Sequence, residues 1–436
     1  MEYKYFDKVK QNCFYLAGSG PCLAKSSLAN GSKNASKINL FVQQFNLHAY
    51  NKVMYDCLAD ASYHIAGYGQ SNEEAITRAL GETVERYAYM SMYFFIKDKI
   101  IKDTYENLIK KSDVLPLEYV NICKIDNKLC TDLSKNETTN WIELFNFCSN
   151  KKIYYPVDLI CSQKDKVKIS VPNMSTGTAV HITQSKALLN AMIEQLQIHL
   201  FLTNWYSANK FRVVRWKETC SPELKKIFNS CFTDMNEVEI EILYCGIEEI
   251  NFKTFVTVIK GKKRYPFCSI GIQGGFNTEE TLLRSVMEAT SIFVNLQAFY
   301  VYKKDEIDML NKDTVMSQIN LDAPFLYWSN FNDYELKTNY LKQITDNKNC
   351  YILSSAENFS QDEQLKKIIH YYKNCLNYFS VIDITPIEAK KCGYSAIRVI
   401  APELIPMNMS GITYDRHPYF KKNGGIKNGY ITQPLP

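Results

Sequence analysis

The sequence predicts a mixed fold of the α/β or α+β class, with repeated strand–helix units arranged around one site. Three segments, at 71–82, 183–194 and 277–288, share one residue pattern. Short apolar runs that alternate with polar residues, as strands do, stand before and between them. The chain has 436 residues, of which 46% are hydrophobic and 22% charged, so it is long enough to bury a large core.

Each of the three segments opens with a residue that favours a helix N-cap, has a small residue at its ninth position and has Glu at its twelfth. The cap residues are Ser71, Thr183 and Asn277, and the glutamates are Glu82, Glu194 and Glu288. The segments begin about 100 residues apart, whereas the repeats of a solenoid are about 20–50 residues long. We therefore expect three helices that deliver polar groups to one shared site.

The three helices should run from about residue 73 past residue 89, over 184–203 and over 278–300. Ser71 with Glu74, and Asn277 with Glu280, have the spacing of a capping box. Each such cap is worth about 1 kcal/mol. The caps are explained by helix stability alone and indicate no function.

Strands, loops and the tail follow from local patterns. Residues 18–36 should form a loop, residues 300–375 should be largely helical, and the proline-containing end at 430–436 should be extended. The chain divides into an N-terminal segment, 1–60, and one large domain, 61–436. Strands are expected at 61–67, 154–161, 237–245, 253–260, 268–273, 380–384 and 395–400.

Composition excludes several classes of protein. The net charge of +5 is small for this length and the basic residues are scattered, so we expect no nucleic-acid partner. No apolar run is long enough to span a membrane, and the start of the chain lacks the apolar region of a signal peptide. The 14 cysteines include no CxxC pair of the zinc-binding kind. We expect a cytoplasmic protein with reduced thiols.

The first repeat carries Glu82 and Glu85 on one helix face, with Arg78 and Arg86 flanking Glu82. Two explanations remain open. In the first explanation, the face is a solvent-exposed row of i,i+4 ion pairs, each of which stabilises the helix by a few tenths of a kcal/mol. Alternatively, it is part of a Mg²⁺–phosphate site, since Mg²⁺ prefers one or two carboxylates and arginine binds phosphate. The chain has no P-loop and no GxGxxG after a strand, so a nucleotide site would be of another kind.

Several of these segments resemble the YcaO family, in order from about residue 60 to the end of the chain. The run 67–88 resembles the first family motif, and the Gln-Pro-Leu-Pro terminus resembles that of azoline-forming members. The other resembling segments are 175–179 with the helix that follows to 199, 283–289, and 393–406.

The resemblance implies an ATP- and Mg²⁺-dependent enzyme whose catalytic domain is 61–436. In azoline-forming members a Cys, Ser or Thr side chain attacks the preceding backbone carbonyl, and ATP phosphorylates the resulting amide oxygen so that it leaves. The products are thiazolines or oxazolines in a ribosomally made precursor peptide. The resemblance also implies a separate E1-like, leader-binding partner chain, and it is compatible with a homodimer.

Site residues carry over from the family motifs. Arg78 could supply the charge of a family lysine that is Tyr68 here. Pro434 and Pro436, with the Pro436 carboxylate, correspond to a tail that assists proton transfer. The remaining assignments are Glu82, Glu85 and Glu194 as metal ligands, and Arg86, Arg284 and Glu288 as nucleotide or phosphate contacts.

The second motif departs most from the family pattern. Lys186 stands where the family has a metal-facing Glu, and Gln197-Ile198 stand where it has a Glu-Arg pair. Three readings follow: an active cyclodehydratase with a divergent nucleotide site, a scaffold that supports a partner's chemistry, or a thioamide- or amidine-forming enzyme. A fourth is an unrelated globular protein whose repeat helices are merely capped surface helices.

Overall fold

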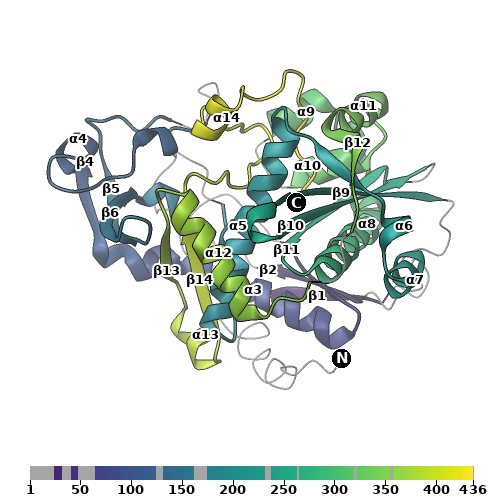
Figure 1. Ribbon diagram of the computed structural model, residues 1–436, viewed down its shortest axis with the longest axis horizontal. Helices are drawn as coiled ribbons and strands as arrows, with labels where there is room; N and C mark the ends of the chain where they lie inside the picture. The colour runs from purple at the N-terminus through teal and green to yellow at the C-terminus, as the bar shows by residue number, and fades with distance from the viewer. Residues whose placement is uncertain are drawn as a thin grey trace.

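The computed structural model describes residues 24–31, 41–47, 64–123, 131–161, 174–230, 237–262, 265–318, 322–353 and 357–435. Helices and strands are mixed, which confirms the predicted fold class. Figure 1 shows α5 (Gln184–Tyr206) running through the middle of the molecule, with small sheets on one side and the largest sheet on the other.

Three strand–helix units organise the molecule. Strand β3 (His64–Gly69) leads into α3 (Asn72–Ile96), β7 (Thr178–His181) leads into α5, and β11 (Cys268–Gly275) leads into α8 (Thr278–Met309). Each strand packs against the helix that follows it. The three predicted helices are confirmed. Helix α8 continues beyond residue 300, with a kink at Lys303.

The largest sheet has the strand order β11-β10-β9-β8-β12. Strands β9 (Val238–Ile247) and β10 (Phe252–Gly261) pair antiparallel along their whole length, which confirms the strands predicted at 237–245 and 253–260. Strand β12 (Thr345–Tyr351) pairs in parallel with β8 (Phe211–Val214). The region 300–375 is largely helical, as predicted, but it also contains the strand β12, which was not predicted.

The helices of the 300–375 region otherwise match the expectation. They are α9 (Lys312–Ser317), α10 (Asp322–Ser329), α11 (Tyr334–Ile344) and α12 (Gln361–Cys375). The remaining α-helices of the described chain are α4 (Tyr105–Leu108), α6 (Trp216–Thr219), α7 (Pro222–Ser230), α13 (Ile387–Lys391) and α14 (Pro418–Lys422).

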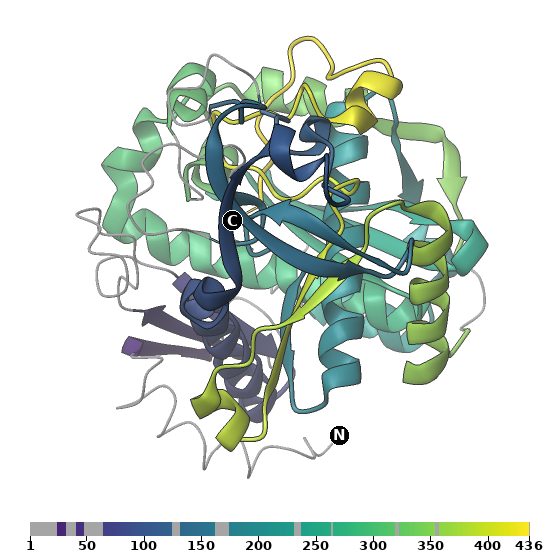
Figure 2. The ribbon, with the colours of Figure 1, turned by 90° about the vertical axis from the view of Figure 1, so that its left-hand side faces the viewer.

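Two three-stranded sheets lie on the other side of α5. One has the order β13-β14-β7, with β13 at Ser380–Asp383 and β14 at Ser395–Ile400, where strands were predicted. The other joins β4 (Ile100–Thr104), β5 (Thr138–Asn146) and β6 (Lys151–Pro156) and is drawn in blue at the front of Figure 2. The strand predicted at 154–161 ends at Pro156, and a 3₁₀ turn follows.

The N-terminal part adds two strands to the first unit. Strands β1 (Ala24–Gly31) and β2 (Phe41–Leu47) pair antiparallel, and β2 pairs with β3. The loop predicted over 18–36 is therefore wrong for the residues of β1. The division at residue 60 stays a prediction, and two strands of this sheet lie before it.

Helix α5 occupies the centre because it is apolar on more than one side. Ala191 and Leu196 belong to one buried cluster, while Phe201 and Trp205 belong to another around the five-stranded sheet. A helix that is hydrophobic around much of its circumference is stable only when other elements cover it. Polar residues on such a helix are therefore held in a fixed, largely buried frame.

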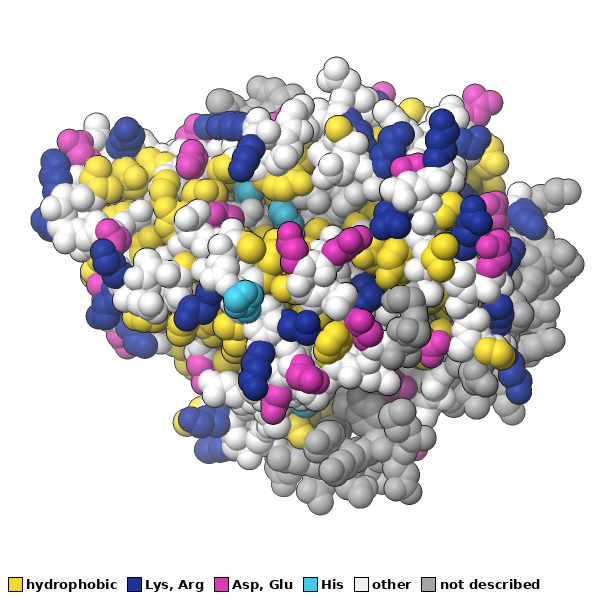
Figure 3. Space-filling model, in the orientation of Figure 1, with side chains coloured by type: hydrophobic (Ala, Val, Ile, Leu, Met, Phe, Trp, Pro, Cys, Tyr) yellow, Lys and Arg dark blue, Asp and Glu magenta, His cyan; other side chains and the backbone are white. Residues whose placement is uncertain are grey.

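Charged side chains of both signs are mixed on the visible surface. On the face shown in Figure 3, Lys and Arg side chains are interspersed with Asp and Glu and form no continuous basic stripe. No helix within the described ranges is long and apolar enough to cross a membrane.

Candidate functional site

The helix starts of the repeated pattern are capped in different ways. The Ser71 hydroxyl accepts a hydrogen bond from the Glu74 N–H at 3.2 Å, but Glu74 Oε2 accepts from the Gln70 N–H at 2.9 Å, so only half of the predicted capping box forms. Asn277 stands at the cap position of α8 but makes no side-chain cap bond, because its Oδ1 accepts from the Phe359 N–H at 2.9 Å. The predicted capping box of Asn277 and Glu280 is therefore wrong, since a tertiary contact takes the cap side chain.

The small ninth residue of the pattern has a packing role. A Cβ added at Gly67 of β3 would lie 2.3 Å from the backbone nitrogen of Ala79, the ninth residue of the first segment. A Cβ at Gly271 of β11 would lie 2.5 Å from the carbonyl oxygen of Ser285, the ninth residue of the third. These contacts are shorter than any Cβ tolerates, so glycine on the strand lets the helix approach closely and fixes where its polar residues lie.

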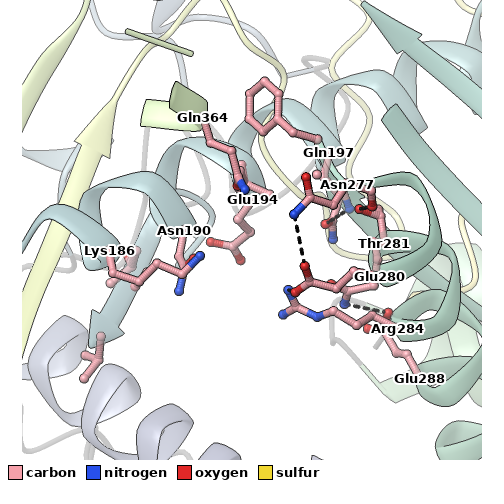
Figure 4. A pocket seen from close by; sticks show the side chains of 18 of the residues that line it. Lys186, Asn190, Glu194, Gln197, Asn277, Glu280, Thr281, Arg284, Glu288 and Gln364 are labelled. Atoms are coloured by element: carbon pink, nitrogen blue, oxygen red, sulfur yellow. Dashed lines mark hydrogen bonds and ion pairs between the residues drawn. The ribbon is translucent and has the colours of Figure 1, made fainter. Parts of the chain in front are cut away.

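A cavity of about 320 Å³ opens where the first turns of α5 and α8 meet the ends of β7 and β11. Figure 4 shows side chains of α5 facing side chains of α8 across this space. Of the predicted site residues, Glu85, Glu194, Arg284 and Glu288 line it. Other polar residues of the wall are Lys186, Asn190, Gln197, Gln273, Asn277, Glu280 and Gln364.

Glu194 is held by the residues that begin β7. Its Oε2 accepts from the Gly177 N–H at 3.0 Å, and the Thr178 N–H also donates to it. Burial raises the pKa of Glu194 to about 7, although Arg86 and the two N–H groups favour its charged form. Burial also raises the pKa of Glu85 well above its usual range, and the Glu194 charge adds to that rise. Because both carboxyl groups are partly buried and their charges repel each other, a bound cation would favour their charged forms.

Glu288 links the first and third units. Its Oε2 accepts from the Ile272 N–H at 2.8 Å and from Gln273 Nε2 at 3.1 Å. Gln273 Nε2 also lies 3.2 Å from the Tyr68 hydroxyl, to which it donates. Burial raises the pKa of Glu288 to about 7. The network joins β3, β11 and α8 at the wall of the cavity.

Glu82 and Arg86 lie outside the residues that line the cavity. Arg86 pairs with Glu82 at 3.2 Å and with Glu85 at 3.5 Å, and it donates a hydrogen bond to the Ser175 hydroxyl. Burial lowers the pKa of Arg86, but the two glutamates more than offset that effect and raise it. Burial raises the pKa of Glu82. In this structure Arg86 joins α3 to the loop before β7, and the metal and phosphate roles of Glu82 and Arg86 stay predictions.

Arg78 also lies outside the cavity lining. Its guanidinium pairs with Glu74 at 2.6 Å and lies 5.1 Å from the centroid of the Tyr68 ring. The proposal that Arg78 supplies the missing lysine charge stays a prediction.

The second motif places a lysine in the cavity wall and an isoleucine in the core. Lys186 is the third residue of α5 and faces the cavity. Gln197 Nε2 donates to the Ile272 carbonyl at 3.2 Å, and Gln197 Oε1 accepts from the Gly274 N–H at 2.6 Å. Ile198 is buried in the core. Gln197 thus joins α5 to β11. This structural role needs only an uncharged amide side chain.

The C-terminal tail is fixed by aromatic side chains. The indole N–H groups of Trp205 and Trp328 donate to tail carbonyls at 2.9 and 2.8 Å, and the Tyr206 hydroxyl accepts from a tail N–H at 3.1 Å. Pro434 is buried and is not among the cavity-lining residues. Pro436 lies outside the described residues. The proton-transfer role of Pro434 and Pro436 stays a prediction.

Arg398 is a residue that the sequence analysis missed. It is only 3% exposed, and it donates to the Thr178 hydroxyl at 2.8 Å and to the Met174 carbonyl at 3.0 Å. These bonds hold the segment whose N–H groups contact Glu194. The visible signal was a charged residue in the middle of the apolar strand 395–400.

The residues present fit a Mg²⁺ ion that phosphate oxygens help to bind. Within the ranges the structure describes, no three His, Cys, Asp or Glu side chains lie close enough to form a metal cluster. Mg²⁺ bound to a nucleotide needs only one or two protein carboxylates. Glu85 and Glu194 would supply that number from two different helices, and because burial raises the pKa of both, a bound cation would favour their charged forms.

A family model matches most of the chain. It is described as YcaO cyclodehydratase, ATP- and Mg²⁺-binding, and it matches residues 66–405. No curated protein matches the chain in sequence.

Solved structures share the fold at low sequence identity. A chain of the E. coli microcin synthetase McbBCD complex matches with a TM-score of 0.65 and 15% identity, over 95% of this chain and 97% of that one. A heterocyclase in complex with substrate and cofactor matches with a TM-score of 0.67 and 13% identity, over 92% of this chain. This chain spans 52% of that heterocyclase. YcaO from Methanopyrus kandleri bound with AMPPCP and Mg²⁺ matches with a TM-score of 0.61 and 11% identity. The match covers 91% of this chain and 90% of that one.

Proposed function

The chain belongs to the YcaO family, whose model is that of ATP- and Mg²⁺-binding cyclodehydratases, and from this premise we propose that it cyclises Cys, Ser or Thr residues of a ribosomally synthesised peptide. The products would be thiazolines or oxazolines. The observation that carries the proposal is the cavity between α5 and α8, which presents carboxylates together with Lys186 and Arg284.

The reaction needs a poor leaving group to become a good one. The thiol or hydroxyl adds to the preceding carbonyl carbon, and the former carbonyl oxygen then leaves as the amide proton is lost and the C=N bond forms. ATP, when bound, supplies the phosphoryl group that makes this oxygen a leaving group, and Mg²⁺ offsets its charge. The protein's own task is mainly to position the reactants and to stabilise charge.

Each part of the site has a role in this proposal. Glu85 and Glu194 hold Mg²⁺, and Arg284 and Glu288 contact the nucleotide. Glu82, on the preceding turn of α3, is a further candidate ligand of the metal ion. Arg86 orients the carboxylates of Glu82 and Glu85, and Arg78 orients Tyr68 on β3. Alternatively, the two arginines contact the phosphate groups. The Pro436 carboxylate, on a tail stiffened at Pro434, accepts the amide proton.

The proposal includes partners. The E. coli McbBCD structure with pro-MccB17 bound is an assembly that holds a peptide. By analogy, we propose that an E1-like, leader-binding chain presents the precursor peptide to this chain, which can also form a homodimer.

A scaffold role is the second candidate, because Lys186, Gln197 and Ile198 leave the second motif with one carboxylate, Glu194. A third is thioamide or amidine formation at the same site. Mass spectrometry separates a thioamide, in which sulfur replaces oxygen, from ring formation, which removes one water. An amidine formed with a peptide amine also loses one water, but it leaves the Cys thiol free, so alkylation of the product with iodoacetamide distinguishes it from a thiazoline.

The test combines the purified chain, its partner, a Cys-containing precursor peptide, ATP and Mg²⁺. We expect phosphate release together with loss of one water per ring, and loss of both in Glu194→Gln. Peptide modification that persists in Glu194→Gln would support the scaffold role. A complete system that releases no phosphate and leaves the peptide mass unchanged would contradict the cyclodehydratase proposal.

A further inference from the structure

The first turn of α5 differs electrostatically from the first turns of the other two unit helices. Helices α3 and α8 each begin with two glutamates, whereas α5 has no acidic residue in its first turn and carries Lys186 there. A helix N-terminus carries partial positive charge, so a cation at this position is unfavourable by itself. The position of Lys186 is therefore not explained by the stability of α5.

Lys186 is also partly buried, and the nearby Glu280 charge compensates only part of the cost of burying its ammonium group. No hydrogen bond or ion pair joins its ammonium group to any residue within the described ranges. Burial lowers the pKa of Lys186, the nearby Arg284 charge lowers it further, and the Glu280 charge offsets only part of this shift. The folded protein thus disfavours the charge of Lys186, which an anion in the cavity would favour.

Arg284 faces the same space from α8. Its Nη1 lies 3.9 Å from Glu280 Oε1, at the limit of an ion pair, and its buried Nε has no hydrogen-bond partner within the described part of the chain. Figure 4 shows Lys186 and Arg284 on opposite walls, with Glu194 between them. Two incompletely paired cations thus lie across one cavity that also holds the pair Glu85 and Glu194.

We propose that Lys186 and Arg284 bind the phosphate groups of ATP directly from opposite walls, so that one Mg²⁺, at Glu85 and Glu194, suffices for nucleotide binding. The inference rests on the use of ATP in the proposed function. The ammonium group of Lys186 repels a second divalent cation near it, and it supplies the positive charge that such an ion would otherwise bring. Lys186 is thus a phosphate-binding residue in place of a metal ligand.

The test measures binding of a non-hydrolysable ATP analogue to the full-length chain by calorimetry. Lys186→Gln keeps a polar side chain that is one atom shorter and removes the charge. We expect it to bind the analogue about 10–100-fold more weakly, as the loss of a charge-assisted hydrogen bond implies. Its affinity for adenosine, which has no phosphate, should equal that of the wild type. Lys342→Gln, on the exposed side of α11, is the matched control and should bind the analogue normally.

The number of metal ions is counted with Mn²⁺ in place of Mg²⁺, by electron paramagnetic resonance. We expect one Mn²⁺ per bound analogue in the wild type, and two in Lys186→Glu at high Mn²⁺ concentration. Two ions in the wild type, unchanged affinity in Lys186→Gln, or an equal loss of adenosine binding would each overturn the inference.

This outcome is separable from that of the proposed function. Lys186-dependent analogue binding without peptide cyclisation would contradict the cyclodehydratase proposal alone. A wild-type chain that binds no analogue would contradict both.

Discussion

Gly177 controls where the carboxylate of Glu194 lies. Its backbone has a φ of +85°, and its N–H donates to Glu194 at 3.0 Å. A Cβ at this position would lie 2.9 Å from the side chain of Gln195. The loop can therefore present its N–H to the carboxylate only if the residue is glycine.

Gly177→Ala tests this dependence. We expect it to lower the free energy of unfolding by about 2–3 kcal/mol, from backbone strain and the contact with Gln195, and to weaken binding of the Mg²⁺-bound ATP analogue. Urea unfolding and calorimetry measure the two effects. Gly424 has a φ of +83° with open space around it, so Gly424→Ala should cost about 1 kcal/mol and leave affinity unchanged. Equal effects of both variants would show that Gly177 has no special link to Glu194.

The sequence predicted those site residues that belong to a recognisable family motif. Glu85, Glu194, Arg284 and Glu288 were named from sequence, and they line the cavity. Arg398 was not named, because its importance depends on a bond to Thr178, a residue 220 positions away in the chain. A contact between distant segments leaves no periodic signal in the sequence.

The unit helices lie where they do because strand and helix backbones touch. At Gly271 an added Cβ would meet the Ala289 nitrogen at 2.2 Å, and the backbone there has no room to move aside. Gly81, within α3, has nothing within 4 Å of its virtual Cβ. We therefore expect alanine to have opposite effects on the free energy of unfolding at these two positions.

Gly271→Ala should lower the free energy of unfolding by about 3 kcal/mol, because the overlap forces β11 away from α8. Gly81→Ala should raise it by about 0.5–1 kcal/mol, because alanine favours the helix and restricts the unfolded chain. Denaturant unfolding of both variants measures the difference. A Gly271→Ala protein as stable as the wild type would mean that the close strand–helix contact does not determine the position of α8.

The tail is an element whose anchoring can be separated from its proposed chemistry. Trp205 and Trp328 bind tail carbonyls before Pro434, so deletion of Pro436 alone leaves those bonds in place. We expect this deletion to reduce the rate of peptide cyclisation at least 10-fold, because the terminal carboxylate is moved back by one residue. Analogue affinity and the melting temperature should stay within error of the wild type. Unchanged turnover would contradict a role for the terminal carboxylate.

The helices and strands that were predicted correctly have a clear pattern of apolar residues in their sequence. Strand β14 is a short, mostly apolar run that is rich in branched side chains, and α8 has apolar residues at helical spacing over many turns. Strand β12 has the sequence TDNKNCY, which resembles a turn, and it is a strand only because β8 lies beside it. Strand β1, with AKSSLANG, is equally polar and depends on β2.

At the scale of the whole molecule, burial departs from what polarity alone predicts. Lys337 is completely buried, and its ammonium group donates to the Tyr327 carbonyl at 2.6 Å and to two oxygens of Asn330 at 2.9 and 3.0 Å. Such a lysine is stable only because the fold brings three acceptors to it. No sequence window shows this, since the acceptors depend on how α10 and α11 pack.

Two buried histidines join the segment around Pro402 to the rest of the molecule. His199 Nδ1 accepts from the Ile405 N–H at 3.1 Å, and His417 Nδ1 accepts from the Tyr419 N–H at 3.1 Å. The other ring nitrogen of His417 donates to the Pro402 carbonyl at 3.0 Å. Both rings must therefore be neutral, because protonated Nδ1 would face an N–H group. Burial lowers the pKa of His199 to about 3 and that of His417 to about 4.

These shifts fix the direction of a pH effect on stability. The pKa of histidine in the unfolded chain is near 6.5. Between pH 6.5 and about 4 the unfolded chain therefore binds a proton at His417 that the folded chain excludes, and the free energy of unfolding falls as the pH falls. Glu194 and Glu288 have pKa values raised to about 7, so their contribution rises as the pH falls from 7 toward 4.5, which opposes the histidines. The wild-type curve alone mixes both effects.

A comparison with His417→Asn isolates the histidine contribution, because asparagine can still cap α14 by accepting from the Tyr419 N–H. From pH 7 to pH 5 we expect the wild type to lose about 2 kcal/mol more unfolding free energy than the variant loses. His370→Asn, at an exposed position, should follow the wild-type curve. Urea unfolding at several pH values measures the slopes. Parallel curves for wild type and His417→Asn would mean that the folded chain accepts a proton at His417, and that this ring does not have to stay neutral to accept from the Tyr419 N–H.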